Sequence, residues 1–565
     1  MNPLKSEIIR QLGALTGLPP EEIEKLLEVP PREELGDYAF PCFALSKKLR
    51  KAPPAIAQEL AKKIQIGEDA FKVTAAGPYL NFSLNKVKYI EAVLTAIFQL
   101  KGNFGTDSSG QGKTMVIDYS SPNIAKPFGI GHLRSTVIGQ ALYLIFQKLG
   151  HPVVRINHLG DWGTQFGKLL VAFGKWGNEK EFEQNPVNYL FELYARFHQE
   201  AEKSPELEDL AREEFRKLEQ GDKENTELWK RFREISLNEF KRIYQILDIE
   251  FDSYAGEAFY DSQIERVLNE LERTKLTEIS QDALVVNLDK FNLPPCLIKK
   301  KDEATLYTTR DLAAALYRHN TYNFHKSLYV VGSAQQLHFQ QVFKVLELMG
   351  YAWSKDCIHV DFGWVKFQEQ ILSTRSGHIL LLEDVLKRSI QLVREIIAEK
   401  NPDLEDKEAV SNQVGIGAVV FAFLSRRRQK DFDFSWEEVL NFDGETGPYL
   451  QYTHARLCSL QRKFDRKIDS GVDFAKIASP EEFQLAKLLE TFPEIIKSSA
   501  EQYEPQILSS YLLKLAGVFN TFYQKVRIIT EDKESTQAKM LLVRCTQMVI
   551  QEGLRLLGIK APERM

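Results

Sequence analysis

The stretch that decides the fold is MVIDYSSPNIAKPFGIGHLRST, residues 115–136. Its first residues form a short apolar run that predicts a buried strand, and the residues from His132 onward place apolar side chains at helical spacing. A loop rich in Ser, Pro and Gly joins the two, and a second strand-like run, PVVRINHLG at 152–160, follows the helix. This order is typical of a doubly wound α/β domain, in which ligands bind beyond the carboxyl ends of the strands.

The loop suits phosphate binding, although the P-loop spacing GxxxxGK[ST] is absent. Gly129 and Gly131 let the backbone approach a ligand, and His132 stands where the helix begins. A helix N-terminus presents unpaired N–H groups to an anion, and an imidazole there can donate a hydrogen bond as charge develops in a transition state. Lys126 adds a cation close by. From spacing alone, a tight glycine turn with His132 as a helix cap fits about equally well.

Composition and length describe an ordinary multidomain protein. The chain has 565 residues, 27% charged residues and a formal net charge of −5. Such a length predicts about three or four domains, and the charge is unlike that of a small basic nucleic-acid-binding module. Local basic patches can still bind RNA. One of them, RRRQK at 426–430, we interpret as a solvated helix face.

No run of residues predicts secretion, a membrane or a structural metal. No apolar stretch is long enough to cross a bilayer, and the N-terminal residues do not resemble a cleaved signal. Five cysteines are scattered singly without a CxxC pair, a pattern that fits a reducing compartment. We therefore expect a cytoplasmic protein with no membrane contact and no protein-bound zinc.

The pattern of the whole chain predicts three domains. Residues 1–105 mix helical patterns with a strand after a Gly-Pro turn, which indicates an α+β domain. Residues 106–395 form the parallel-sheet domain, and the charged helical stretch at about 178–247 is an insertion in it; α/β signals return at DALVVNL. Residues 396–565 are nearly all helical by periodicity.

The motifs resemble those of one enzyme family. GIGHLRST resembles the HIGH signature of class I aminoacyl-tRNA synthetases, and the flanking SSPNIAKPF and RINHLGDWGTQFGK resemble the arginyl-tRNA synthetase family. Further similar motifs follow in order: GEAFY at 256, LYTTRDLAAAL at 306, QQLHF at 335, LSTRSG at 372, GETGPYLQYTHARL at 444 and LGIKAPERM at the end. The resemblance extends from about residue 36 to the C-terminus.

This resemblance implies a fold and an activity. The fold is multidomain α/β, with a Rossmann-like (HUP-type) catalytic domain, an appended N-terminal domain that contacts the tRNA elbow and an all-α, DALR-like anticodon-binding domain. The activity is ATP-dependent activation of L-arginine and its transfer to the 3′ end of tRNA-Arg. Mg²⁺ is carried with ATP, activation needs bound tRNA, and a monomer is expected.

An arginine pocket can be assigned to particular residues. A guanidinium ligand needs carboxylates arranged for paired hydrogen bonds, and Tyr307 and Asp311 share one face of a predicted helix. By resemblance, Glu257, Tyr307 and Asp311 hold the guanidinium. Ser121, Asn123 and Gln335 hold the α-amino and carboxylate groups. Without the resemblance, Asp311 would be a helix-start residue and Glu257 a surface acid.

The resemblance implies ATP contacts on two loops. The residues are Gly129, Gly131, His132, Ser373, Thr374 and Arg375, and His132 and Lys126 are catalytic. The loop at 370–378 aligns with the KMSKS signature, but Ile371 and Thr374 replace its lysines, and Gly129 replaces the first histidine of HIGH. These departures leave an alternative open, a weakened or inactive paralogue that binds tRNA or arginine. A small-molecule nucleotidylyltransferase would leave the helical C-terminal region unexplained.

Two further sites are candidates for tRNA. Tyr452 and Arg456 lie four residues apart on one predicted helix face, and an aromatic ring beside a cation suits stacking on anticodon bases. In GPYLNF, Tyr79 and Asn81 are candidate contacts to the tRNA elbow by resemblance. A strand with Tyr79 or Phe82 in the core fits that motif nearly as well.

Overall fold

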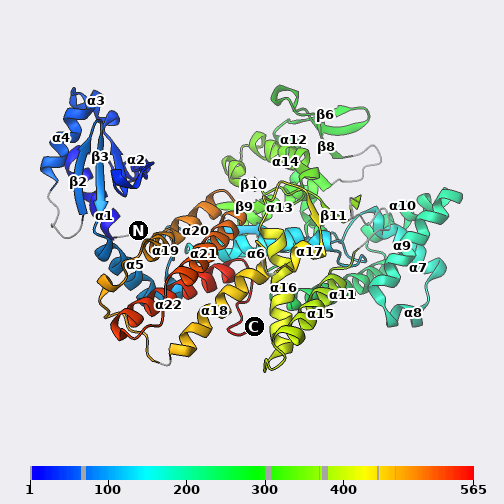
Figure 1. The fold of residues 1–565 in the computed structure, drawn as a ribbon. Helices are drawn as coiled ribbons and strands as arrows, with labels where there is room; N and C mark the ends of the chain where they lie inside the picture. Colours follow the sequence, from blue (N-terminus) through cyan, green and yellow to red (C-terminus); the bar gives the residue numbers. More distant parts are fainter. Residues whose placement is uncertain are drawn as a thin grey trace.

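The computed structural model describes residues 3–64, 71–299, 307–367, 370–371, 380–441, 444–464 and 466–565. Figure 1 shows a central body of sheet and helices, with the N-terminal domain standing at one end and the inserted helices at the other. The helices of residues 447–556 lie between the N-terminal domain and the central sheet (Figure 1). The chain therefore has the multidomain α/β architecture expected from its sequence.

The N-terminal domain is a three-stranded antiparallel sheet covered by helices. The strands, in the order β1-β3-β2, are β1 (Tyr38–Pro41), β2 (Phe71–Ala76) and β3 (Tyr79–Leu84). The helices are α1 (Pro3–Thr16), α2 (Pro20–Leu26), α3 (Phe43–Leu49) and α4 (Pro53–Lys63), with a 3₁₀ turn η1 (Glu33–Leu35). Helix α5 (Lys86–Leu100) then leaves the domain and packs on the C-terminal helices, where Tyr89 contacts the ring of Phe483 edge-on at 5.5 Å.

A four-stranded parallel sheet forms the centre of the molecule. Its order is β10-β9-β4-β5. The strands are β4 (Met115–Asp118), β5 (Val153–Ile156), β9 (Lys326–Tyr329) and β10 (Cys357–His359). The 3₁₀ turn η2 (Lys101–Asn103) precedes β4, and helix α6 (Ile130–Lys148) connects β4 to β5. The predicted parallel-sheet domain is confirmed, and the loop with His132 lies at the carboxyl end of β4.

The inserted region is helical. It contains α7 (Thr164–Trp176), α8 (Glu179–Gln184), α9 (Pro186–Lys203), α10 (Glu206–Glu219) and α11 (Lys223–Ile246). Helix α11 returns to the sheet, and the hydroxyl of its Tyr244 lies 2.7 Å from Ser120 Oγ and accepts a hydrogen bond from Asn157 Nδ2 at 2.8 Å. The insertion is therefore fixed to the ends of both β4 and β5.

A three-stranded antiparallel sheet follows the inserted region in the chain and precedes β9. It is formed by β6 (Thr277–Ser280), β7 (Ala283–Val286) and β8 (Cys296–Lys299). The elements around it are η3 (Glu257–Gln263), α12 (Ile264–Arg273), η4 (Asp289–Phe291) and α13 (Tyr307–Tyr322). The strand expected at DALVVNL is present as β7, but it belongs to this antiparallel sheet and not to the parallel sheet. Gln281 and Asp282 both have positive φ (49° and 60°), so a tight turn pairs β7 with its neighbour β6.

The remaining chain joins the sheet to a bundle of helices. After β9 come η5 (Ser333–Gln335), α14 (Gln336–Leu348) and η6 (Ala352–Asp356). Three short strands, β11 (Val365–Phe367), β12 (Gln370–Ile371) and β13 (Phe432–Phe434), form a sheet in the order β12-β11-β13. Strand β13 falls in the region expected to be nearly all helical, and it pairs in parallel with β11.

The C-terminal helices complete the fold. They are α15 (Leu382–Lys400), α16 (Lys407–Leu424), α17 (Trp436–Val439), α18 (Gly447–Phe464), η7 (Phe474–Lys476), α19 (Pro480–Glu490), α20 (Phe492–Glu501), α21 (Gln506–Lys525) and α22 (Lys533–Leu556). Among the helices of the described ranges, none is long and apolar enough to cross a membrane.

Candidate active site

The loop after β4 has an unusual backbone that side chains hold in place. Ser120 and Ser121 have φ values of 72° and 46°, in the left-handed region that residues other than glycine rarely adopt. Ser135 Oγ of α6 accepts a hydrogen bond from the Ser120 N–H at 2.9 Å, and Thr136 Oγ1 lies 2.8 Å from Ser120 Oγ. Such strain costs about 1–3 kcal/mol per residue and is typical of functional sites.

His132 caps the first turn of α6 and keeps a donor for a ligand. The N–H of Gly129 donates to His132 Nδ1 at 3.1 Å, so Nδ1 is unprotonated and Nε2 carries the hydrogen of the neutral ring. Burial lowers the pKa of His132 to about 4. At neutral pH the ring is therefore uncharged, and Nε2–H remains a hydrogen-bond donor. The cap therefore leaves Nε2–H available for the phosphate contact expected from the sequence.

Lys126 and Gly131 flank this donor. The Lys126 ammonium lies 5.0 Å from the ring centroid of Tyr194 on α9, and its positive charge contributes to the lowered pKa of His132. Gly131 is exposed, and a Cβ placed there would meet no atom within 4 Å. Open space therefore lies in front of the N-terminus of α6, beside a cation.

Glu257 is positioned by the segment GDWG that follows β5. Asp161 of this segment is buried, and its carboxylate accepts hydrogen bonds from Arg233 Nε at 2.7 Å and from the Ala258 N–H at 2.9 Å. A Cβ at Gly256 would lie 2.6 Å from Asp161 Oδ1, so the close approach requires glycine. The inserted helix α11, through Arg233, thus helps to fix the residues around Glu257.

The carboxyl group of Glu257 is buried and incompletely satisfied. Its Oε2 atom has no hydrogen-bond partner in the described part of the chain. Burial, and then the charge of nearby Asp311, raises the pKa of Glu257 to about 8. A buried carboxyl group beside a second acid is stabilised by a cationic ligand with several N–H donors.

Asp311 is the second acid, in the first turns of α13. Its Oδ2 accepts a hydrogen bond from His338 Nε2 at 2.6 Å, and His158 Nε2 lies 4.0 Å from its Oδ1. Arg318 Nη2 donates to His158 Nδ1 at 3.3 Å, so the hydrogen of neutral His158 lies on the nitrogen that faces Asp311. Burial acts to raise the pKa of Asp311, but the hydrogen bond from His338 brings it below its usual value.

An ion pair that sequence reasoning missed supports this edge of the sheet. Asp118, the last residue of β4, pairs with Arg318 of α13 at 2.8 Å, and both side chains are almost fully buried. Ser121 Oγ donates to Asp118 Oδ1 at 2.9 Å. The sequence does contain a signal for this ion pair, because Asp118 and Arg318 each stand in or next to an apolar run. His158, Asp161 and His338 were also missed, although they lie within the motifs that carry the family resemblance.

The other candidate arginine contacts lie at the same edge of the sheet. Asn123 follows β4 and packs against Gly160, which follows β5. A Cβ added to Gly160 would lie 1.8 Å from Asn123 Oδ1. Gln335 is exposed and follows β9. The Tyr307 hydroxyl lies 3.6 Å from the position of a Cβ at Gly163. Asn123 and Gln335 thus follow the carboxyl ends of the neighbouring strands β4 and β9, and Tyr307 reaches the segment after β5 from the start of α13.

The candidate ATP contacts in the loop at 370–378 lie outside the described residues. They are Ser373, Thr374 and Arg375. Within the described ranges, no group of three or more His, Cys, Asp and Glu side chains could hold a metal ion.

Tyr452 and Arg456 line a cavity in the helical C-terminal region. The Arg456 guanidinium lies 4.9 Å from the ring of Tyr452 and 5.3 Å from that of Tyr523, and its Nη1 donates to Asn520 Oδ1 at 3.0 Å. The cavity has a volume of about 630 Å³, and Arg462 is a further basic residue in its wall. Its wall also contains Arg564 and the acids Asp403 and Glu405, so three arginines face two carboxylates. A cavity that combines aromatic rings with an excess of arginine suits a nucleotide base.

The two candidates in the N-terminal domain differ in exposure. Tyr79 is half-buried and lies edge-on to the ring of Phe43 at 5.8 Å. Asn81 is only 4% exposed, and Phe82 is fully buried in the core. Asn81 pairs with Ala39 of β1 and Thr74 of β2 in the centre of the sheet, so its side chain does not reach the surface as the candidate contact requires.

Three families match consecutive parts of the chain. Residues 2–84 match the arginyl tRNA synthetase N terminal domain, residues 93–436 match the catalytic domain of tRNA synthetases class I (R), and residues 450–565 match the DALR anticodon binding domain. The chain belongs to the arginyl-tRNA synthetase family. This family assignment agrees with the parallel-sheet catalytic domain, the separate N-terminal domain and the helical C-terminal domain.

Full-length relatives of the arginyl-tRNA synthetase family are similar throughout. An arginine--tRNA ligase of Clostridioides difficile is 51% identical over 545 residues, which cover 96% of each chain. One from Alkaliphilus metalliredigens is 47% identical over 566 residues and covers 100% of both chains. The structure of Thermus thermophilus arginyl-tRNA synthetase superposes with a TM-score of 0.82 at 26% identity, covering 100% of this chain and 99% of that one. Members of this family are class I aminoacyl-tRNA ligases that use ATP.

Proposed function

We propose that the site at the carboxyl edge of the parallel sheet activates L-arginine with ATP and transfers it to the 3′ end of tRNA-Arg. The observation that carries this proposal is the buried, unpartnered oxygen of Glu257, close to the charge of Asp311. An arginyl group supplies both the positive charge and the planar set of N–H donors that these carboxylates lack.

Arginine binding is proposed to use residues from several strand ends. The guanidinium pairs with Glu257 and Asp311 and donates a hydrogen bond to the Tyr307 hydroxyl oxygen. Ser121, Asn123 and Gln335 hold the α-amino and α-carboxylate groups. Since His338 occupies one oxygen of Asp311 without substrate, arginine shares or replaces that contact. Amino acids without a guanidinium leave two acids unpaired and are rejected without an editing domain.

Activation is proposed to occur in front of α6. An oxygen of the arginine carboxylate attacks the α-phosphorus of ATP, and the bond to the bridging oxygen breaks to release pyrophosphate. His132 donates from Nε2 and Lys126 supplies charge to the phosphates, with help from Gly129, Gly131 and the loop of Ser373, Thr374 and Arg375. Mg²⁺ enters with ATP. A ribose hydroxyl of the tRNA end then attacks the arginyl carbonyl, and AMP leaves.

We propose that tRNA contacts the N-terminal domain and the helical C-terminal region. The cavity of Tyr452 and Arg456 is assigned to anticodon bases, because it combines exposed aromatic and basic side chains. Tyr79 is retained as an elbow contact, and Asn81 is left out because it is buried.

Domain boundaries near residues 105 and 395, a monomeric state and a cytoplasmic location remain part of this proposal.

Arginine-dependent ATP–pyrophosphate exchange tests the function. We expect labelled pyrophosphate to enter ATP when arginine and tRNA-Arg are present, and much less exchange when tRNA is omitted. Lysine in place of arginine is the control, because its ammonium cannot pair with two carboxylates as a planar fork. No exchange in either condition, from a folded chain, would favour the inactive paralogue and refute the proposal.

Arginine binding is expected to release a proton from Glu257. Because the pKa of Glu257 is about 8, this group is mostly protonated at pH 7, whereas the guanidinium binds its carboxylate form. The apparent affinity for arginine therefore rises with pH, by up to about tenfold per pH unit, and levels off above pH 8. Calorimetry at pH 7 in two buffers of different ionisation enthalpy measures the proton directly.

Two variants make this pH prediction specific. Glu257→Gln removes the titrating group, so the released proton and the rise of affinity below pH 8 disappear. Glu265→Gln, the same change at an exposed position of α12, leaves both unchanged. Proton release that persists in Glu257→Gln would assign the titration to another group.

A further inference from the structure

The basic run RRRQK at 426–430 does not lie on a helix, although all of its residues except Arg428 are exposed. Helix α16 ends at Leu424, so the run lies in the loop that leads to β13. The side chain of Arg428 is only 12% exposed, and for this residue the interpretation from sequence was wrong because tertiary partners surround it. Arg426 in the same loop is 44% exposed and pairs with Glu438 at 2.6 Å.

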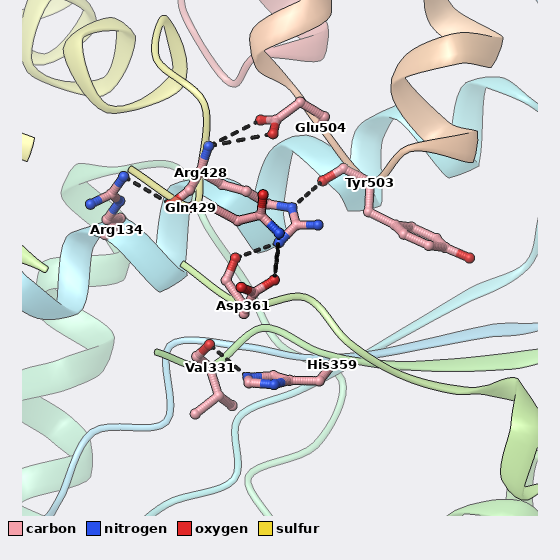
Figure 2. Close-up of polar contacts among 8 residues, drawn as sticks. All are labelled: Arg134, Val331, His359, Asp361, Arg428, Gln429, Tyr503 and Glu504. Atoms are coloured by element: carbon pink, nitrogen blue, oxygen red, sulfur yellow. Dashed lines mark hydrogen bonds and ion pairs between the residues drawn. The ribbon is translucent and has the colours of Figure 1, made fainter. Parts of the chain in front are cut away.

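Arg428 connects two parts of the chain that are distant in sequence. On one side, its Nη1 donates to Oδ1 and to the main-chain oxygen of Asp361, both at 2.5 Å. On the other, its Nε donates to the Tyr503 carbonyl at 3.2 Å, and its main-chain N–H donates to the Glu504 carboxylate at 3.3 Å. Figure 2 shows Arg428 between Asp361 and the Tyr503–Glu504 corner.

The Asp361 side of this contact is fixed to the helix that carries His132. Arg134, two residues after His132 on α6, is 1% exposed. Its guanidinium donates to the carbonyls of Gly363 at 2.8 Å, Trp364 at 3.0 Å and Arg428 at 3.0 Å, and also to that of Lys430. The Gly363 N–H donates in turn to the Arg428 carbonyl at 2.9 Å. Trp364 leads into β11, so these hydrogen bonds connect α6, β11 and the Arg428 loop to one another.

The Tyr503–Glu504 side leads to the cavity assigned to anticodon bases. These two residues lie between α20 and α21. Helix α21 has 20 residues, so it spans about 30 Å. Near its far end, Asn520 accepts a hydrogen bond from Arg456, and the ring of Tyr523 faces the Arg456 guanidinium. Helix α21 therefore begins just after the two residues that contact Arg428 and lines the cavity near its other end.

We propose that Arg428 is a positioning residue that couples tRNA binding in this cavity to arginine activation. The inference rests on the proposed function. A base that binds beside Arg456 and Tyr523 displaces α21, and Tyr503 and Glu504 pass this displacement to Arg428. Arg428 passes it to Asp361 and, through the carbonyls held by Arg134, to α6 and His132. Packed elements joined by discrete polar contacts transmit such shifts because they do not deform continuously.

The test is Arg428→Gln in the full chain. We expect kcat for arginine-dependent exchange with saturating tRNA-Arg to fall about tenfold. The KM values for arginine and ATP and the Kd for tRNA are expected to stay within about twofold, since Arg428 contacts none of these ligands. Arg428→Lys is expected to restore part of the rate, because its ammonium still reaches Asp361.

Three further variants distinguish a coupling role of Arg428 from a local structural one. Asp361→Asn removes the same ion pair from the other side, and the double variant is expected to lose no more than either single one. Arg426→Gln makes the same change at the exposed arginine of this loop and should leave exchange unchanged. A wild-type rate in both Arg428→Gln and Asp361→Asn, or a loss of tRNA affinity as large as the loss of kcat, overturns the coupling. No exchange by the wild-type chain would instead refute the proposed function on which it rests.

Discussion

Asp311→Asn is expected to lower kcat/KM for arginine by about 30- to 1,000-fold, while the affinity for ATP stays nearly unchanged. The side chain of Asp311 is 22% exposed and lies close enough to Glu257 to raise its pKa. Removing one charge from a largely buried charge pair costs about 2–4 kcal/mol, partly because the guanidinium is left without its partner. Asparagine keeps the size of the side chain, so the loss reports charge rather than a cavity.

Separate measurements of the two substrates check this expectation. Calorimetric titrations with arginine and with ATP give the two affinities, and exchange kinetics give kcat/KM. Asp289→Asn, at an exposed position in η4, is the matched control and should behave like the wild type. An arginine affinity within about twofold of the wild-type value would show that Asp311 does not hold the guanidinium.

The parts of the site that follow local rules could be predicted from sequence. The β4–α6 unit has a strand-like apolar run followed by helical periodicity, and the helix N-terminus places His132 where the structure has it. The start of a helix at Tyr307 and its shared face with Asp311 also follow from spacing. The roles of Glu257 and Asp311 needed the family resemblance, because single acids at such positions are usually structural or exposed.

The parts that depend on distant partners could not be predicted. Arg134 bonds to a carbonyl 229 residues away, and Arg428 pairs with an aspartate 67 residues away. Arginine is rarely buried, so each position alone favours a surface residue, and burial becomes favourable only with its tertiary partners. Strand β13 has three residues, and its pairing with β11 leaves no periodic pattern in a helical region.

His132→Ala is expected to lower kcat for exchange by about 100- to 1,000-fold, with a much smaller effect on the KM values for ATP and arginine. The Nε2–H of His132 makes no hydrogen bond within the described part of the chain, so it can stabilise charge that develops only in the transition state, and loss of one such donor costs about 3–4 kcal/mol. Because burial lowers the pKa of His132 to about 4, the ring stays neutral above pH 5. The pH profile of kcat should then show no inflection near 6.5 from this residue. His325→Ala, at an exposed histidine, is the control.

Two polar replacements separate the donor role of His132 from its capping role. In His132→Asn, the side-chain oxygen lies near the position of Nδ1 and can accept from the Gly129 N–H, but no donor replaces Nε2. In His132→Gln, the amide nitrogen lies near the position of Nε2 and can donate to phosphate, while the cap is lost. If the donor accelerates the reaction, His132→Asn is as slow as His132→Ala and His132→Gln keeps part of the rate. The reverse order, with His132→Asn near the wild-type rate, would mean that His132 serves mainly to cap α6.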